Sequence, residues 1–309
     1  MSETVIEVKN LIKNYGDFRA VDGISFEVRK GEVFSILGPN GAGKTTTVEI
    51  MECLRKPSSG EVKVLGFDIA HQQNDIRKRV GILPQDFNTY DLLTVKENID
   101  YFGVMFDRSI PTQELLDAVN LNDKKDEYFK NLSGGLKQRV GVAIAMVNDP
   151  DIIFLDEPTT GLDPKARREV WEVVKDLKRK GKTVILTTHY MEEAEVLSDR
   201  LAIMNGGRFI AYDTPRAIIK EHGYGTLCII RSANDKAMQL LTATGLSVKR
   251  KDGDVEVHMD DKSSLHKVVE VLQDPDAYYD EITVKRSSLE DVFLKLTGKR
   301  IEDDTGAKA

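Results

Sequence analysis

A glycine-rich segment near residue 40 carries the residue types that bind phosphate groups. The pattern G-x-x-x-x-G-K-[ST] is met by Gly38-Pro39-Asn40-Gly41-Ala42-Gly43-Lys44-Thr45, and Thr46 follows. Glycine lets backbone N–H groups wrap around phosphate oxygens, and a helix after the loop points its positive end at them. We expect Lys44 to contact the β- and γ-phosphates and Thr45 to coordinate Mg²⁺. The segment therefore predicts a site for ATP and its magnesium ion.

Two carboxylates follow an apolar run more than a hundred residues later along the chain. Ile152–Leu155 is apolar throughout and is followed at once by Asp156 and Glu157. The carboxyl end of a buried strand is where ligands of such sheets gather. Asp156 suits Mg²⁺ coordination, and Glu157 is placed to polarise an attacking water as general base. A solvated strand end is the alternative, and the phosphate loop earlier in the chain favours the catalytic interpretation.

The elements that must position these residues alternate between strand and helix patterns. Ile152–Leu155 and Val184–Leu186 are uninterrupted apolar runs, as expected for strands covered on both faces. Between them, Ala166–Lys180 has the pattern of an amphipathic helix, on which we expect the single tryptophan, Trp171, to pack into the core. This order predicts a mostly parallel α/β sheet.

The region before the sheet strands divides into β-rich and helix-rich parts. Three short β-rich runs precede the phosphate loop, at Val5–Val8, Ile24–Val28 and Val33–Leu37. Helix-periodic segments fill the chain from about residue 91 to residue 148, and Thr94 with Glu97 forms a capping box at the start of one.

After Pro215 the pattern changes and predicts a second, smaller domain. The order of strand-like and helix-like segments is βαββαβ, which matches a ferredoxin-like unit: Leu227–Arg231, Asp235–Thr244, Ser247–Arg250, Val255–Met259, Ser263–Gln273 and Glu281–Lys285. A last helix over Ser287–Leu296 has a capping box of Ser287 with Glu290, and residues 302–309 have the composition of a polar tail. We place the domain boundary near residue 220, which gives domains of 1–220 and 221–309.

Composition excludes several classes of protein. The 309 residues carry a formal net charge of -7, so no strong basic field exists to attract nucleic acid. Cys53 and Cys228 stand far apart without metal-ligand spacing, which disfavours disulfides and zinc and fits a reducing cytosol. The first residues lack the features of a secretory signal, and the longest apolar run, Val140–Val147, falls short of the ~18 residues of a membrane helix. We therefore expect a chain that does not cross a bilayer by itself.

One further motif gives the chain a family resemblance. Leu132-Ser133-Gly134-Gly135-Leu136-Lys137-Gln138-Arg139 resembles the signature of the ABC ATPase family. Ser133, Gly134 and Gly135 open a helix whose N–H groups can bind an anion. In the family, this helix caps the γ-phosphate held by the opposite subunit, so the resemblance implies a head-to-tail dimer around two ATP molecules. Position 136 departs from the pattern because it is Leu where Gln is usual.

The remaining family elements occur in the expected order, and their roles are implied by the resemblance. Tyr15 matches the aromatic residue that stacks on adenine, although packing alone is an alternative. Gln85 matches the glutamine that touches Mg²⁺ or water. Asp163 matches the loop that communicates between subunits. His189 matches the histidine that contacts the γ-phosphate, and its place after a buried strand aims it at the same sheet edge as Asp156.

The resemblance also implies the fold, the partners and the place of action. It covers roughly residues 3 to 220 and implies an antiparallel β subdomain before a P-loop core, with a helical insert at about 86–150. Within that insert, residues 86–105 would receive a helix of a membrane permease. Ser287-Ser288-Leu289-Glu290-Asp291-Val292-Phe293 resembles the end of ATPases paired with ABC-2-type exporter permeases. The implied protein is one half of a dimer that lies on the cytoplasmic face of a membrane, bound to that permease. A homodimer is favoured, and a pair of this chain with a related partner is the alternative.

Alternatives within and outside transport remain at this point. A ferredoxin-like appendage also resembles regulatory domains of importer ATPases, and it could equally be a structural or dimer-stabilising module. A non-transport member that acts in DNA repair or translation is the alternative outside transport. Chromosome-type members of the family separate the phosphate loop from the signature by a long coiled coil, and translation members carry two cassettes. A binding module without hydrolysis would be expected to lose Glu157 or His189, and both are present. The transported molecule itself touches the membrane subunits, so this chain does not reveal it.

Overall fold

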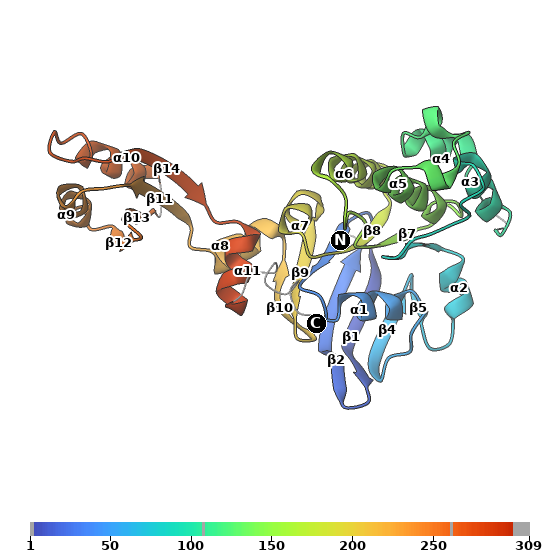
Figure 1. The fold of residues 1–309 in the computed structure, drawn as a ribbon. Coiled ribbons are helices and arrows are strands. Elements are labelled where there is room, and N and C mark those ends of the chain that lie inside the picture. The colour runs from blue at the N-terminus through green and yellow to red at the C-terminus, as the bar shows by residue number, and fades with distance from the viewer. Residues whose placement is uncertain (1–2, 107–108, 260–261, 299–309) are drawn as a thin grey trace. The chain divides into compact units, whose positions relative to one another are not determined.

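The computed structural model describes residues 3–106, 109–259 and 262–298. It divides into two compact units, the first ending at Pro215 and the second beginning at Arg216 (Figure 1). No helix among these described residues is both long enough and apolar enough to cross a membrane.

The first unit is built around a six-stranded sheet. Its strand order is β10-β9-β3-β8-β7-β6, with β3 Val33–Leu37, β6 Val80–Leu83, β7 Ile152–Asp156, β8 Thr183–Thr188, β9 Arg200–Asn205 and β10 Arg208–Asp213. All neighbours pair in parallel except β10, which is antiparallel to β9. The predicted mostly parallel α/β sheet is confirmed.

Apolar side chains on both faces of this sheet build two separate cores. Phe34, Ile36 and Phe154 point into a core shared with the N-terminal sheet and α1 (Lys44–Met51). Val33, Leu155 and Val184 point into the opposite core with the helices, which also buries Trp171. Figure 1 shows the helices α3 to α6 on one side of the sheet and α1 on the other. Continuous apolar strands follow from this double coverage, since alternate residues face alternate cores.

A second sheet is antiparallel and combines two strands before the phosphate loop with two strands after it. Its order is β2-β1-β4-β5, with β1 Thr4–Tyr15, β2 Phe18–Arg29, β4 Ser59–Val64 and β5 Phe67–Asp68. β1 and β2 are each twelve residues long, far longer than the apolar runs predicted for them. The difference arises because one face of this sheet is solvated, so polar residues alternate with apolar ones and hide the strand from a search for apolar runs.

Helices fill the rest of the first unit. They are α2 Gln73–Arg77, α3 Val95–Gly103, α4 Thr112–Ala118, α5 Gly134–Ala145, α6 Pro164–Arg179 and α7 Met191–Leu197, with 3₁₀ turns at Asn122–Lys124 and Phe129–Asn131. The Thr94–Glu97 capping box is present at the start of α3, as predicted.

The second unit has the βαββαβ order of a ferredoxin-like fold. Its antiparallel sheet has the order β12-β13-β11-β14, with β11 Thr226–Arg231, α9 Asp235–Ala243, β12 Ser247–Lys251, β13 Asp254–Met259, α10 Lys262–Val271 and β14 Glu281–Arg286. Helices α8 (Pro215–His222) and α11 (Leu289–Thr297) flank this set in sequence. The predicted polar tail, residues 302–309, lies outside the described residues.

The predicted cap of the last helix was wrong by one residue. Ser288, not Ser287, is the N-cap of α11, and its capping box is formed with Asp291 instead of Glu290. Ser287 instead receives a hydrogen bond from the Tyr224 N–H and donates one to the Gly225 carbonyl. Both frames fit the sequence pattern, so the competing contacts of Ser287 decide which serine caps the helix.

Candidate functional site

A cavity of about 390 Å³ gathers half of the site residues that the sequence analysis selected. It lies at the carboxyl ends of β3 and β7 and beside the turn between β1 and β2. Its lining consists of Tyr15, Phe18, Ala20, Asn40, Gly41, Gly43, Lys44, Thr45, Thr46, Gln85 and Glu157. Nine of these eleven residues were candidates from the sequence, and Phe18 and Ala20 were not.

The loop between β3 and α1 depends on glycine at two positions. Gly43 has φ of 105°, and a Cβ there would lie 2.3 Å from the Ala20 carbonyl oxygen. A Cβ on Gly38 would lie 2.3 Å from the Met204 carbonyl oxygen. Gly43 is also the N-cap of α1 and offers no side chain to its first N–H groups. Those N–H groups therefore stay available to an anion at the helix N-terminus.

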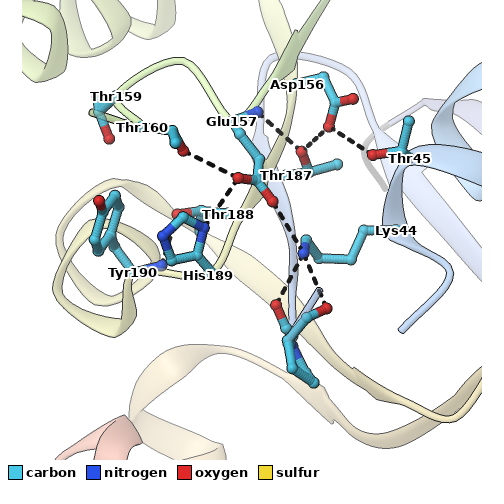
Figure 2. A network of polar contacts seen from close by, with 12 residues as sticks. Lys44, Thr45, Asp156, Glu157, Thr159, Thr160, Thr187, Thr188, His189 and Tyr190 are labelled. Atoms are coloured by element: carbon cyan, nitrogen blue, oxygen red, sulfur yellow. Dashed lines mark hydrogen bonds and ion pairs between the residues drawn. The ribbon is translucent and has the colours of Figure 1, made fainter. Parts of the chain in front are cut away.

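Lys44 is held firmly at the bottom of this cavity. Its Nζ donates to the carbonyl oxygens of Gly38 at 2.9 Å and Pro39 at 3.2 Å. It also forms an ion pair with Glu157 Oε1 at 3.0 Å, and both side chains are only 4% exposed. Figure 2 shows the ammonium group between the loop carbonyls and Glu157. A phosphate that binds Lys44 would compete with Glu157 for the same ammonium group.

The backbone of Glu157 directs its side chain towards Lys44. Glu157 has φ of 48°, in the left-handed region that costs a residue other than glycine about 1–3 kcal/mol. Its N–H donates to both the carbonyl and the hydroxyl oxygens of Thr187 on the neighbouring strand β8, at 3.1 and 3.0 Å. These bonds hold the strained conformation in place.

Three groups surround the Glu157 carboxylate, and two of them, Lys44 and His189, keep it ionised. Besides Lys44, the Thr160 hydroxyl donates to Oε2 at 3.0 Å and His189 Nδ1 lies 2.9 Å from the same oxygen. Burial opposes ionisation, but the His189 hydrogen bond and the Lys44 charge outweigh it and lower the pKa of Glu157 to about 2. The carboxylate is therefore a hydrogen-bond acceptor at neutral pH.

Asp156 and Thr45 form a second polar pair beside the cavity. Thr45 Oγ1 donates to Asp156 Oδ1 at 3.3 Å, and Thr187 also donates its hydroxyl to this oxygen. Burial raises the pKa of Asp156, whereas the bonds from Thr187 and Thr45 lower it. The result is a cluster of hydroxyl and carboxylate oxygens, which are the ligand atoms that magnesium prefers.

The predicted signature residues and Asp163 do not line this cavity. Ser133 is the N-cap of α5, and its side chain accepts from the Leu136 N–H. Asp163 is the N-cap of α6 and accepts from the N–H groups of Lys165 and Ala166, both at 2.9 Å. The two helix starts approach closely, because a Cβ on Gly135 would lie 2.7 Å from the Ala166 Cβ. Gly134 likewise leaves room for Leu162.

The hairpin between β1 and β2 supplies an aromatic residue that the sequence analysis missed. Tyr15 and Phe18 are paired across the turn and both line the cavity. Tyr15 has Lys13 Nζ at 5.0 Å and the Arg55 guanidinium at 5.7 Å from its ring centroid. Phe18 is 63% exposed. The two-residue spacing between them, Gly16-Asp17, is a hairpin signal that could have revealed the pair.

Comparison with known proteins gives the family. A sequence model described as "ABC transporter" matches residues 21–160. The Nod factor export ATP-binding protein I of Paraburkholderia xenovorans is 39% identical over 98% of this chain and 100% of its own. The chain belongs to the ABC transporter ATP-binding family. A daunorubicin resistance ATP-binding protein of Streptomyces coeruleorubidus is 36% identical over 96% of this chain and 97% of its own.

Solved ABC cassettes share the fold of the first unit. A dimeric cassette in a post-hydrolysis state, bound to ADP and Pi, aligns with a TM-score of 0.61 and 29% identity over 68% of this chain and 98% of its own. The cbiO1 subunit of a Clostridium perfringens ABC transporter complex aligns with a TM-score of 0.65 and 29% identity over 72% of this chain and 92% of its own. Like other members of the ABC family, this chain binds ATP and is an ATP hydrolase.

The two aromatic residues of the hairpin lead to a first prediction. Replacing Tyr15 by Ala, or Phe18 by Ala, should weaken ATP binding about 5- to 150-fold with kcat nearly unchanged, since base–aromatic stacking contributes about 1–3 kcal/mol. Binding of a fluorescent ATP analogue and steady-state kinetics measure both effects. The binding of GTP should be weakened as much as the binding of ATP, because every base has a π-face on which an aromatic side chain can stack. The exposed Tyr278, in the second unit, serves as the matched control for loss of an aromatic ring. Wild-type ATP affinity in both variants would contradict the stacking role.

Proposed function

We propose that this chain works as a homodimeric, magnesium-dependent ATPase that drives export through a separate ABC-2-type permease. The observation that carries the proposal is the meeting of Lys44 and His189, from two different segments, at the carboxylate of Glu157, which lines the cavity together with Lys44. Relatives that span the whole chain support the direction of transport, because they are export and drug-resistance proteins.

Thr45 and Asp156 would hold the magnesium ion, and Gln85 at the cavity wall would contact it or a water. Hydroxyl and carboxylate oxygens in this cluster fit Mg²⁺, which usually completes its shell with phosphate oxygens and waters. The ion would neutralise charge on the phosphates. Two protein ligands are enough for such an ion, since the substrate supplies ligands too.

Glu157 would act as the general base towards the attacking water. Lys44 now holds its pKa low, and a γ-phosphate that took over Lys44 would remove one of the groups responsible. The pKa of Glu157 would then rise towards the range in which a carboxylate accepts a proton efficiently. Binding of the substrate would thus make Glu157 a better base towards the water that attacks the γ-phosphate.

His189 would orient Glu157 and contact the γ-phosphate. Its Nδ1 lies against Glu157, which leaves Nε2 as the nitrogen that can face a ligand. The tilted ring of Tyr190 packs on His189 with 4.1 Å between centroids. His189 is 19% exposed, so a ligand can still reach it.

Ser133, Gly134, Gly135 and Asp163 would complete the site of a second copy of the chain. They lie on the same unit as the cavity but outside its lining, as expected for residues that act across an interface. Leu136 cannot make the side-chain bond of the usual Gln. The serine cap and the N-terminus of α5 supply the remaining anion contacts.

The helical insert would receive the permease on the cytoplasmic face of the membrane. Exposed apolar side chains concentrate between residues 90 and 106, where Leu92 is 70% and Val104 is 82% exposed. The rings of Tyr90 and Tyr101 pack edge to face with 4.8 Å between their centroids and join the loop to α3. An exposed apolar cluster of this kind is typical of a surface that binds another protein.

Replacement of Val104 by Asp tests this proposal. We expect the amount of permease that co-purifies with the variant to fall at least about tenfold, because binding would bury the new charge at an apolar contact. Transport in reconstituted vesicles should fall with it, while the melting temperature of the isolated chain stays the same. Val196→Asp, at a position of α7 that is 46% exposed, is the matched control. Equal loss in both variants, or in neither, would contradict docking at the insert.

A further inference from the structure

A fully buried carboxylate lies close to the site but outside its cavity. Glu193 is 0% exposed and is the third residue of α7, four positions after His189. Burial raises the pKa of this carboxyl group, and polar contacts with Thr188, Thr159 and Trp171 oppose the rise. A carboxylate at such a position is unfavourable unless its hydrogen bonds compensate, and an apolar residue would pack there at less cost. The contacts of Glu193 therefore need an explanation.

Two donors from different segments converge on one oxygen of Glu193. The Thr159 hydroxyl donates to Oε1 at 2.8 Å, and the Trp171 indole N–H donates to the same oxygen at 2.8 Å. The Thr188 hydroxyl is near enough to affect the pKa of Glu193 but forms no hydrogen bond with the other oxygen, Oε2. This buried oxygen has no hydrogen-bond partner among the residues that the structure describes. The two bonds at Oε1 thus tie Glu193 to Thr159 and Trp171.

Thr159 belongs to the loop that runs from Glu157 to Asp163. Its neighbour Thr160 donates to the Glu157 carboxylate, so two adjacent residues of the loop form hydrogen bonds with Glu157 and Glu193. Figure 2 shows Thr159 and Thr160 beside Glu157 and opposite the His189–Tyr190 segment. The position of this loop therefore determines where the Glu157 carboxylate lies and where Asp163, the N-cap of α6, lies.

Helix α6 contacts the same segment at a second point. Arg167 lies one turn before Trp171, and its guanidinium is 3.8 Å from the centroid of the Tyr190 ring. Residues four apart share a helix face, so one face of α6 holds both Tyr190 and Glu193. The start of α7 is therefore in contact with α6 and, through Thr159, with the loop that precedes α6.

We propose that Glu193 is a positioning residue that fixes the loop carrying Glu157 and Asp163 against the segment carrying His189. The proposal rests on the function proposed above, because it assumes that Glu157 and His189 act on the γ-phosphate. Glu193 itself touches neither the cavity nor the reacting atoms. Glu193 would fix the position of Glu157 relative to His189. It would also fix the position of both residues relative to Asp163, which we place at the subunit interface.

The expected kinetic signature is a loss of kcat without a loss of ATP binding. Lys44 and the phosphate loop do not contact Glu193, so the KM for ATP should change less than about threefold. Misplacement of a catalytic group by about 1 Å can lower the rate on the order of 100-fold. We expect Glu193→Leu, which leaves the Thr159 hydroxyl and the Trp171 N–H unpaired, to lower kcat about 10- to 100-fold.

Conservative and control variants separate positioning from folding. Glu193→Gln keeps an oxygen that accepts both hydrogen bonds, so its kcat should stay within about threefold of wild type. Glu192→Leu, at the exposed neighbouring position of α7, is the matched control and should keep both kcat and KM. Phosphate release by the purified full-length chain, normalised to ATP-binding sites, measures all of them.

The outcomes decide between the possibilities. A kcat of Glu193→Leu within twofold of wild type overturns the proposal, and so does a Gln variant as impaired as the Leu variant. If Glu193→Leu does not fold, Thr159→Val decides, because it removes one donor and keeps the Glu193–Trp171 bond. We expect its kcat to fall severalfold at unchanged KM, and a wild-type kcat overturns the proposal. A wild-type chain without ATPase activity would instead contradict the proposed function, and this role with it.

Discussion

Replacing Glu157 by Gln is expected to lower kcat by about 100- to 10,000-fold while ATP binding is preserved. Glutamine has the same shape and can still accept from Lys44, but it cannot take a proton from water. The loss should therefore appear in turnover and not in ATP affinity. With hydrolysis blocked, Mg-ATP should hold two copies of the chain together.

Phosphate release and light scattering measure these effects with and without Mg-ATP. The matched control is Glu172→Gln, which changes an exposed carboxylate paired with Lys175 on α6 and should keep wild-type turnover. A Glu157→Gln variant that hydrolyses ATP at the parental rate would remove Glu157 from the role of base. A variant that binds ATP but stays monomeric would contradict the proposed homodimer.

Replacing Lys44 by Met is expected to have two large effects. ATP affinity should fall at least about 100-fold, because a buried cation that would contact the phosphates is lost. Without any nucleotide, the chain should also lose about 3 kcal/mol of stability, since the buried Glu157 carboxylate would lose its ammonium partner and keep His189 and Thr160, which are not fully buried. Denaturant unfolding and nucleotide titration measure the two effects separately.

The stability effect should depend on pH in a defined direction. Glu157 has its pKa lowered from 4.5 to about 2, so its stabilising contribution is complete above pH 4.5 and is lost as the pH falls towards 2. Lys44 is one cause of that shift, and the gap in unfolding free energy between wild type and Lys44→Met should therefore narrow below pH 4.5. The control is Lys30→Met, which breaks an exposed pair with Glu3 and should cost less than about 1 kcal/mol at any pH. A gap that does not change with pH would contradict the coupling of Lys44 to Glu157.

The sequence by itself determined the features that depend on local patterns. The phosphate loop, the apolar strands β7 and β8 and the βαββαβ order of the second unit all follow from residue types at short spacings. It also indicated which side chains would gather at one edge of the sheet, because parallel strands place their carboxyl ends together. The family resemblance rests on these same local motifs.

Only the tertiary structure decided which groups touch. The strand order β3-β8-β7 brings Lys44, His189 and Glu157 to neighbouring positions, and no local pattern encodes that order. Glu193 meets Thr159 and Trp171 through the packing of α6 and α7. On sequence alone Glu193 is one of several acidic residues on a helix. Its burial and its hydrogen bonds arise from contacts between segments far apart in the chain, and these long-range contacts give the site its geometry.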